Sequence, residues 1–260
     1  MLNTPLISII TVVYNGERFL QQTIDSVFNQ TYKNIEYIII DGGSTDGTLS
    51  IIKANEHKIS KWISEPDKGL YDAMNKGILL AKGSLIGMIN SDDWYEHNVV
   101  DIMVEAFIAN PKNTIFHADR YDVHDDGSKS LKRFNKSSFK FKYYGMTYNH
   151  PSMFVAKEEY NKHLYNIKLR ALADYQFVLE AYLRDKSTFY YINQPVVNYR
   201  LEGISAQMNL KNVLKEGFIA RKNAGFNFFQ NILSVAIRFS IKKFQLLFYK
   251  SIDLLSIIAF

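Results

Sequence analysis

Two stretches near the start of the chain decide the fold: residues 6–16, which read LISIITVVYNG, and residues 35–47, which read IEYIIIDGGSTDG. Each is a run of apolar, mainly β-branched residues that stops at a turn-forming sequence, as a buried strand does. Residues 17–29 between them carry apolar side chains at helical spacing. This order predicts two parallel strands joined by a helix.

The alternation continues with a strand at 62–64, a helix at 70–81 and a strand at 85–89. Near-continuous apolar strands that alternate with helices predict an α/β fold with a Rossmann-like, mostly parallel sheet and helices on both faces. Ligands of such sheets bind beyond the carboxyl ends of the strands. Asp41 and the pair Asp92-Asp93 directly follow strands, so we expect a ligand site at that edge.

The composition excludes several classes of protein. The chain has 260 residues, of which 47% are hydrophobic and 22% charged, as in a globular protein with a substantial core. It has no cysteine, which excludes disulfides, zinc–thiolate sites and a cysteine nucleophile. The net charge of +5 is too small and too scattered to indicate a nucleic-acid partner. GxGxxG and Gly-Lys sequences are absent, so dinucleotide and P-loop sites have no support.

The last thirty residues differ in character. Apolar side chains recur there every three or four positions, at Leu233, Ile237, Ile241, Phe244, Phe248, Ile252 and Leu255. Arg238, Lys242, Lys243 and Lys250 fall away from that stripe. The pattern predicts an amphipathic C-terminal helix that lies on a membrane surface. The alternative is a helix that packs on the sheet or on a second subunit.

Domain boundaries follow from this change of character. We expect a catalytic domain at 1–228, with a nucleotide-binding half at 1–110 and an acceptor half at 111–228, and a helical tail at 229–260. No apolar run is long enough to span a bilayer, and no basic start precedes the first apolar run. We therefore expect a cytoplasmic protein that is peripheral on the inner face of the cell membrane.

Asp92 and Asp93 are the strongest candidates for chemistry. Two adjacent carboxylates after a buried strand are costly to desolvate unless a cation offsets them. Mg²⁺ or Mn²⁺ would do so, typically with one or two carboxylates and phosphate oxygens as ligands. The alternative is that Ser91 or Asp92 caps the helix that contains Val99. Taken alone, the pair favours the capping role.

Asp41 is a second candidate, because glycines beside it let the backbone approach a ligand closely. Its carboxylate would accept a hydrogen bond from a nucleobase. The alternative is a turn residue, which is the more natural role for Asp46 in the same loop.

Four motifs in order carry a resemblance: TVVYNGE at 11–17, IIIDGGSTDGT at 38–48, SEPDKGLYDAMNKG at 64–77 and MINSDDWY at 88–95. Together they resemble family 2 glycosyltransferases, and the match is collinear over 6–100, with weaker pieces as far as 205. The resemblance implies the GT-A fold and a role in building a bacterial surface polysaccharide, such as lipopolysaccharide or capsule.

The resemblance also implies a site. The residues that bind the nucleotide and the donor would be Thr11, Val13, Tyr14, Glu17, Asp41, Lys68, Asp92 and Arg200. Asp93 would hold Mg²⁺ or Mn²⁺, although the motif lacks a carboxylate two positions before Asp92. His150 and Asp119 would contact acceptor or donor. The donor would be a nucleotide sugar, usually of UDP, and the acceptor a glycan or lipid-linked oligosaccharide.

Asp174 is the candidate base. Displacement with inversion needs a carboxylate across the sugar from the leaving diphosphate, to take the proton of the acceptor hydroxyl. Asp174 lies in LRALADYQFVLEAY at the expected start of a helix, where the family has a catalytic aspartate. The alternative is a helix cap. Two other functions stay open: a sugar-phosphate nucleotidyltransferase, and a non-catalytic nucleotide-sugar-binding protein.

Overall fold

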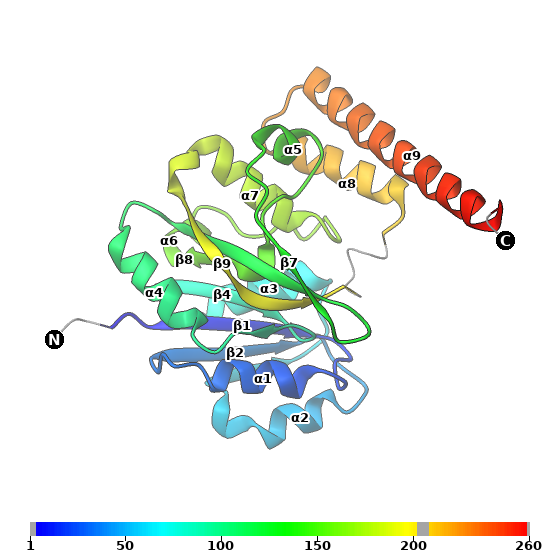
Figure 1. The fold of residues 1–260 in the computed structure, drawn as a ribbon. Helices are drawn as coiled ribbons and strands as arrows, with labels where there is room; N and C mark the ends of the chain where they lie inside the picture. The colour runs from blue at the N-terminus through cyan, green and yellow to red at the C-terminus, as the bar shows by residue number, and fades with distance from the viewer. Residues whose placement is uncertain (1–3, 202–207, 259–260) are drawn as a thin grey trace.

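The structure is a computed structural model that describes residues 4–201 and 208–258, with side chains as far as Phe244. Its centre is one twisted sheet with the strand order β3-β2-β1-β4-β8-β6-β9-β5, to which β7 adds by pairing with β6 (Figure 1). The strands are β1 (Ile7–Val13), β2 (Ile35–Asp41), β3 (Lys61–Ser64), β4 (Leu85–Asn90), β5 (Trp94–Tyr95), β6 (Ile115–Val123), β7 (Lys129–Lys132), β8 (Phe154–Ala156) and β9 (Phe189–Arg200).

The direction of the strands sets where the site lies. β1 runs parallel to β2 and β4, β2 runs parallel to β3, and β6 runs parallel to β9. β8 is antiparallel to both β4 and β6, so these two point the same way. The carboxyl ends of β1, β2, β4, β6 and β9 therefore share one edge. The predicted mostly parallel sheet is confirmed.

Helices cover both faces of the sheet, as predicted. The helices are α1 (Leu20–Phe28), α2 (Thr48–Ala54), α3 (Leu70–Leu80), α4 (Val99–Ala109), α5 (Ser138–Tyr143), α6 (Lys157–Tyr160), α7 (Ala173–Arg184), α8 (Leu210–Asn223) and α9 (Phe228–Ile258), with short 3-10 turns at Glu56–Lys58, His150–Ser152 and Lys186–Thr188. Alternate residues of each strand face opposite cores. Ile39 packs with α1, α2 and α4, whereas Ile38 and Ile40 pack with α3, α5 and α7.

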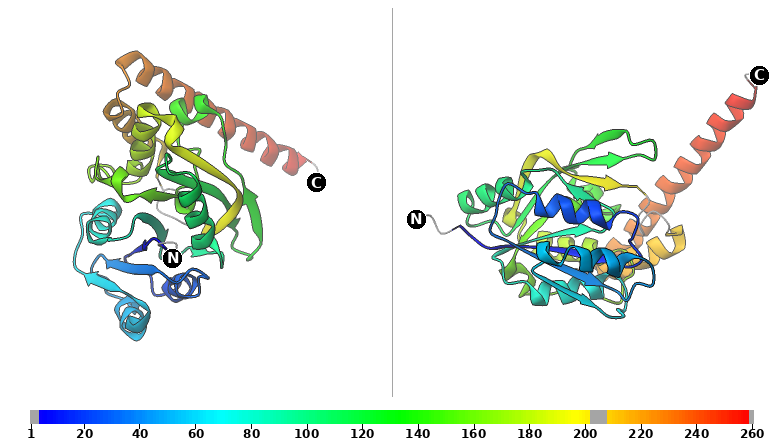
Figure 2. Two further views of the ribbon diagram at one scale, coloured as in Figure 1. Left: turned by 90° about the vertical axis from the view of Figure 1, so that its left-hand side faces the viewer. Right: turned by 90° about the horizontal axis from the view of Figure 1, so that it is seen from below.

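The C-terminal helix does not pack on the sheet. α9 begins at Phe228, lies against α5 and α8, and then continues away from the body of the molecule (Figures 1 and 2). Its anchored part includes the buried Asn231 and Ser234 and a hydrogen bond of 2.7 Å from Arg238 Nη1 to the Tyr144 carbonyl.

The buried face of α9 differs from the predicted stripe. Leu233, Ile241 and Phe244, which the pattern placed on one apolar face, are all exposed. The side chains that follow Phe244 in that stripe lie outside the described ones. In the described part of the chain, no helix has the length and apolar character needed to cross a bilayer.

Candidate functional site

The loops that follow β1 and β2 form one rigid unit. Asn15 has a left-handed backbone, with φ of 50°, and its N–H donates to Ser44 Oγ at 2.8 Å. Glu17 Oε2 accepts from the Gly47 N–H at 2.6 Å. Glu17, predicted to be near the nucleotide, thus joins the two loops at the carboxyl edge of the sheet.

Asp41 is turned into its own loop. Its side chain is fully buried, and the carboxylate accepts from the Gly43 N–H, the Ser44 N–H, the Ser44 hydroxyl and the Ser64 hydroxyl, the last at 2.6 Å. The carboxylate therefore shapes the β2–α2 loop, and a nucleobase would have to replace one of these donors to reach it.

The first strand presents only one of its predicted ligands to solvent. The side chains of Thr11 and Val13 are buried in the core beside α1, where Thr11 Oγ1 lies 3.0 Å from the Tyr37 hydroxyl. Any contact of these two residues with a nucleotide would come from their backbone. Tyr14 is 64% exposed and lies beside Gly42. Its ring is thus a surface on which a base can stack.

The loop before α3 closes against the same place. Gly42 lies directly against this loop: a Cβ there would come within 2.4 Å of Asp67 Oδ2, so a larger residue would displace the Asp67 side chain. Asp67 also accepts from the Gly69 N–H at 2.8 Å, and the Lys68 N–H donates to Asp72 at 3.0 Å. Lys68 itself is exposed, so its ammonium group lies at the rim of this edge.

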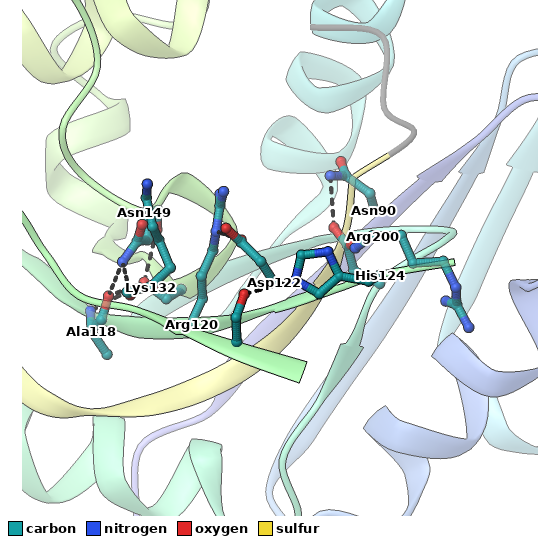
Figure 3. Close-up of polar contacts among 11 residues, drawn as sticks. Asn90, Ala118, Arg120, Asp122, His124, Lys132, Asn149 and Arg200 are labelled. Carbon is teal, nitrogen blue, oxygen red and sulfur yellow. Dashed lines mark hydrogen bonds and ion pairs between the residues drawn. The ribbon is translucent and has the colours of Figure 1, made fainter. Parts of the chain in front are cut away.

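Asp92 and Asp93 do not start a helix. The short strand β5 follows them, and α4 begins only at Val99, with Asn98 as its N-cap residue. The capping interpretation is therefore wrong. Asp93 is fully buried, and it accepts from Asn90 Nδ2 at 3.0 Å and from the Arg200 N–H at 2.9 Å; the two donor residues are labelled in Figure 3.

The electrostatics of Asp93 are those of a buried acid next to a second acid. Burial, and then the neighbouring charge of Asp92, raise the pKa of Asp93 to about 8, although Arg200, Asn90 and Arg120 act in the opposite direction. A hard divalent ion would reverse this shift, because it stabilises the carboxylate form. No group of three His, Asp or Glu side chains converges on one point within the described residues. Oxygen atoms of a diphosphate would thus have to complete the coordination of an ion held at Asp93 and Asp92.

Arg200 ends β9 beside this pair. Its guanidinium donates to the Asp92 carbonyl and, at 2.7 Å, to Gln22 Oε1, so the side chain points toward α1 (Figure 3). It also lies over the rings of Phe19 and Trp94, 3.9 and 4.5 Å from their centroids. The predicted phosphate contact would require the guanidinium to leave at least one of these partners.

Sequence reasoning missed two residues of the site, Arg120 and Tyr199. Arg120 is on β6 and pairs with Asp122 at 2.7 Å (Figure 3). Its guanidinium carbon also lies 4.0 Å from the centroid of the Tyr199 ring on β9. Its charge is one of those that lower the pKa of Asp93. The available signal was position: both residues lie in strands near the carboxyl edge, next to Asp119 and Arg200, which were noticed.

Asp174 is held in place by two donors. The Tyr71 hydroxyl of α3 donates to Asp174 Oδ1 at 2.9 Å, and the Tyr175 N–H donates to the same oxygen at 2.8 Å. Oδ2 has no hydrogen bond with any described residue. The N-cap residue of α7 is Leu172, so Asp174 is not the cap. One carboxylate oxygen is thus positioned while the other is available.

The acids that follow β4 and the acid of α7 all affect the electrostatics of Tyr199. Burial is the main cause that raises the pKa of this phenol, and Arg120 opposes it, but the charges of Asp93, Asp92 and Asp174 all raise it further. All three acids therefore act on one side chain. Asp41 lies at the same edge, on β2, but its carboxylate is occupied within its own loop.

The two predicted contacts of the acceptor half differ. His150 is half-buried, with Nε2 3.1 Å from the Tyr165 hydroxyl; burial lowers its pKa and the charge of Asp174 opposes that shift. It is thus a neutral neighbour of Asp174. Asp119 is buried, and accepts from the Phe134 N–H at 2.7 Å and the Tyr191 hydroxyl at 2.8 Å. Asp119 therefore fixes the segment after β7 and is closed to an acceptor in this conformation.

Comparison with known proteins agrees with this geometry. A model of glycosyl transferase family 2 matches residues 8–165. The hyaluronan synthase of Pasteurella multocida is 27% identical over 228 residues, which cover 86% of this chain but 23% of the synthase. The chain thus spans about a quarter of that relative.

Solved structures show the same fold at low identity. S. aureus TarS 1-349 in complex with UDP-GlcNAc has a TM-score of 0.68 and 17% identity, over 90% of this chain and 71% of that one. The mannosyltransferase PcManGT from Pyrobaculum calidifontis, in complex with GDP-Man and Mn²⁺, has a TM-score of 0.64 and 15% identity, over 90% and 70%. The GT-A fold implied by the motifs is confirmed. Because the family model covers more than half of the chain, this protein belongs to glycosyl transferase family 2.

Proposed function

We propose that the protein is an inverting, metal-dependent glycosyltransferase that moves a monosaccharide from a nucleotide sugar to a hydroxyl group of a glycan or lipid-linked oligosaccharide. The observation that supports it most is the buried Asp93 next to Asp92, held by Asn90 and by the Arg200 N–H at the carboxyl edge of the sheet. The charges of Asp92, Asp93 and Asp174 all raise the pKa of Tyr199, which fits a site that these acids share. We further propose a UDP-sugar as the donor, in keeping with the UDP-GlcNAc complex of TarS, and a role in the synthesis of a surface polysaccharide.

The donor would lie across the carboxyl edge of the sheet. The base would stack near Tyr14, and the diphosphate would extend toward Asp92 and Asp93, with Lys68 at the rim. Mg²⁺ or Mn²⁺ bound at Asp93 would neutralise the charge that develops on the leaving diphosphate. Asn90 and the Arg200 N–H hold the Asp93 carboxylate in position.

Asp174 would act as the general base. Its Oδ1 is fixed by Tyr71 and by the Tyr175 N–H, so Oδ2 is the oxygen that would accept the proton of the attacking hydroxyl. The acceptor oxygen attacks the anomeric carbon from the side opposite to the leaving phosphate, and one displacement gives inversion. His150, which contacts Tyr165, would border the acceptor.

The acceptor would be reached from a membrane surface. Phe239, Ile241 and Phe244 are exposed on α9, and Lys242 and Lys243 lie between them and are exposed as well. Apolar and basic side chains together suit an anionic membrane surface. We therefore keep the proposal of a catalytic domain at 1–228 and a tail that holds it at the cytoplasmic face of the membrane.

The alternative of a sugar-phosphate nucleotidyltransferase is less well supported. Such an enzyme would present a glycine-rich basic loop after β1, whereas the loop here is Tyr14-Asn15-Gly16-Glu17. The product distinguishes the two reactions, since nucleotidyl transfer releases pyrophosphate and glycosyl transfer releases a nucleoside diphosphate.

The test is donor turnover in Asp174→Asn, with Asp185→Asn, at the other end of α7, as the matched control. We expect Asp174→Asn to lower the rate of transfer about 10²–10⁴-fold and to leave the affinity for UDP and Mn²⁺ unchanged. Asp93→Asn should instead abolish the rise in thermal stability that Mn²⁺ and UDP produce together. Undiminished transfer in both variants would contradict the proposed mechanism.

A further inference from the structure

Two arginines lie in the interior at the corner where α5, α8 and α9 meet, on the other side of the molecule from α1 and α2 (Figure 1). Arg221 of α8 is 0% exposed, and none of its three guanidinium nitrogens has a hydrogen-bond partner. Arg238 of α9 is half-buried; it donates to the Tyr144 carbonyl, but its Nε is also without a partner.

These two charges act on each other and meet no carboxylate. Burial lowers the pKa of Arg238, Tyr144 opposes that shift, and the like charge of Arg221 lowers the pKa further. Neither arginine forms an ion pair with an Asp or Glu among the described residues. A fully buried cation and a half-buried one, with no carboxylate paired to either, are costly to keep charged, so an anion bound beside them would be stabilised by both charges.

The surrounding backbone makes room for both guanidinium groups. A Cβ at Gly217 would lie 3.1 Å from Arg221 Nη2, and a Cβ at Gly145 would lie 2.7 Å from Arg238 Nη1. Gly145 also has a φ of 154°, at the limit of the left-handed region. Each guanidinium group therefore lies directly against a glycine, and a larger residue at that position would displace it.

Tyr175 lies beside Arg221. Its ring lies 6.0 Å from the Arg221 guanidinium carbon, and its hydroxyl donates to the carbonyls of Phe141 and Lys142, at 2.9 and 3.0 Å. Burial raises the pKa of this phenol, and the charge of Arg221 and a long, weak polar contact between the Arg221 guanidinium and the phenol oppose that shift. The tyrosine thus stays neutral and does not supply the missing negative charge.

We propose that Arg221 and Arg238 form a binding site for a phosphate group, distinct from the donor site. Guanidinium groups bind phosphate oxygens through paired N–H donors, and two of them match the charge of a phosphate dianion. Arg221 is enclosed, so the group would enter where α9 lies on α5 and α8. The phosphate would be free in solution or belong to a lipid whose chains contact the exposed apolar side chains of α9.

The experiment compares the thermal stability of the full-length chain in sodium phosphate and in sodium chloride of equal ionic strength, without nucleotide. A second arm measures sedimentation with phosphatidylcholine vesicles that contain phosphatidic acid or, at equal surface charge, phosphatidylserine, so that the attraction of the basic tail to a charged surface is the same in both. Arg221→Gln and Arg238→Gln are the test variants, and Arg170→Gln, an exposed arginine of the same half, is the control.

For the wild type and Arg170→Gln we expect phosphate, at ten times its Kd, to raise the Tm by about 3–5 °C, or phosphatidic acid to increase the sedimented fraction above that with phosphatidylserine. Both test variants should lose the response. A response to phosphate indicates the free ion, and a response to vesicles alone indicates a lipid. If Arg221→Gln does not fold, Arg238→Gln decides. No response from the wild type in either arm, or an equal response in the variants, would overturn the proposal.

Discussion

Asp174 illustrates how little a residue type says about its role until its neighbours are known. An aspartate at the start of a helix is a good cap, yet the cap position of α7 belongs to Leu172 and Asp174 bonds instead to Tyr71, 103 residues earlier in the chain. A similar contrast holds for Asp93, which is buried against Asn90 and the Arg200 backbone rather than exposed at a helix end. Long-range partners thus decide both roles.

The burial of His117 makes the stability of the fold depend on pH in a predictable direction. It is 2% exposed on β6, its ring lies 4.5 Å from that of Phe134 and 4.7 Å from that of Tyr148, and its Nδ1 has no hydrogen-bond partner. Burial lowers its pKa to about 3 from the usual 6.5. Below pH 6.5 the unfolded chain therefore binds a proton that the folded chain does not, and stability falls as the pH falls toward 3.

We expect His117→Phe, which keeps a ring in this cluster, to remove that dependence. Between pH 7 and pH 5 the wild type should lose up to about 2 kcal/mol more free energy of unfolding than the variant. Urea denaturation at the two pH values measures the difference. Equal losses in the two proteins would show that His117 is not neutral in the folded state.

At the scale of elements, close contact between α3 and β1 depends on Gly77. A Cβ at this position would lie 2.5 Å from Ile10 Cγ2 and 3.3 Å from Ile10 Cδ1. α3 also carries Tyr71, which bonds to Asp174, and Asn75, which bonds to the backbone of Tyr165. The position of this helix on the sheet therefore sets the position of the acceptor half.

Gly77→Ala has two opposing effects on the free energy of unfolding. Alanine is a better helix former by about 1 kcal/mol, whereas overpacking a core contact costs about 1–3 kcal/mol. We expect a net loss of about 1–2 kcal/mol in the free energy of unfolding, measured by chemical denaturation. Ser50→Ala, at an exposed position of α2, is the control and should stabilise slightly. A stabilised Gly77→Ala protein would refute the close contact.

At the scale of the whole molecule, the site depends on strands that are distant in sequence but end at one edge. β4 supplies the loop with Asp92 and Asp93, β6 supplies Arg120 and β9 supplies Tyr199 and Arg200. α9 belongs to this scale too, because its first turns are anchored to α5 and α8.

Truncation after Phe244 separates anchoring from membrane binding. Asn231, Ser234 and Arg238 remain in that protein, so we expect an unchanged Tm and unchanged donor turnover, but loss of most sedimentation with anionic vesicles. Truncation after Gln230 removes the buried residues as well and should lower the Tm. Vesicles of phosphatidylcholine alone are the control. If the shorter cut leaves sedimentation intact, the tail is not the membrane contact.

The sequence by itself determined the alternating strands and helices of residues 6–89 and the edge of the sheet at which Asp41, Asp92 and Asp93 lie. Hydrophobic periodicity is a property of consecutive residues. A buried parallel strand followed by a polar turn, as before Asp41 and before Asp92, can therefore be predicted without knowing which strands lie next to it. It also identified the family through four motifs. The start of α4 at Ser91 or Asp92, considered as an alternative, was wrong because β5 lies between these residues and α4. β5 forms by pairing with β9, which is distant in sequence.

The tertiary structure alone decided what each side chain contacts. Whether Asp41 is open or occupied depends on Ser44 and Ser64, and whether Arg221 is paired depends on how α8, α9 and α5 pack. Hydrogen bonds and packing between segments that are far apart in the chain produce no periodic pattern in the sequence. For that reason the sequence did not indicate that Arg120 and Tyr199 belong to the site, which follows from the pairing of β6 with β9.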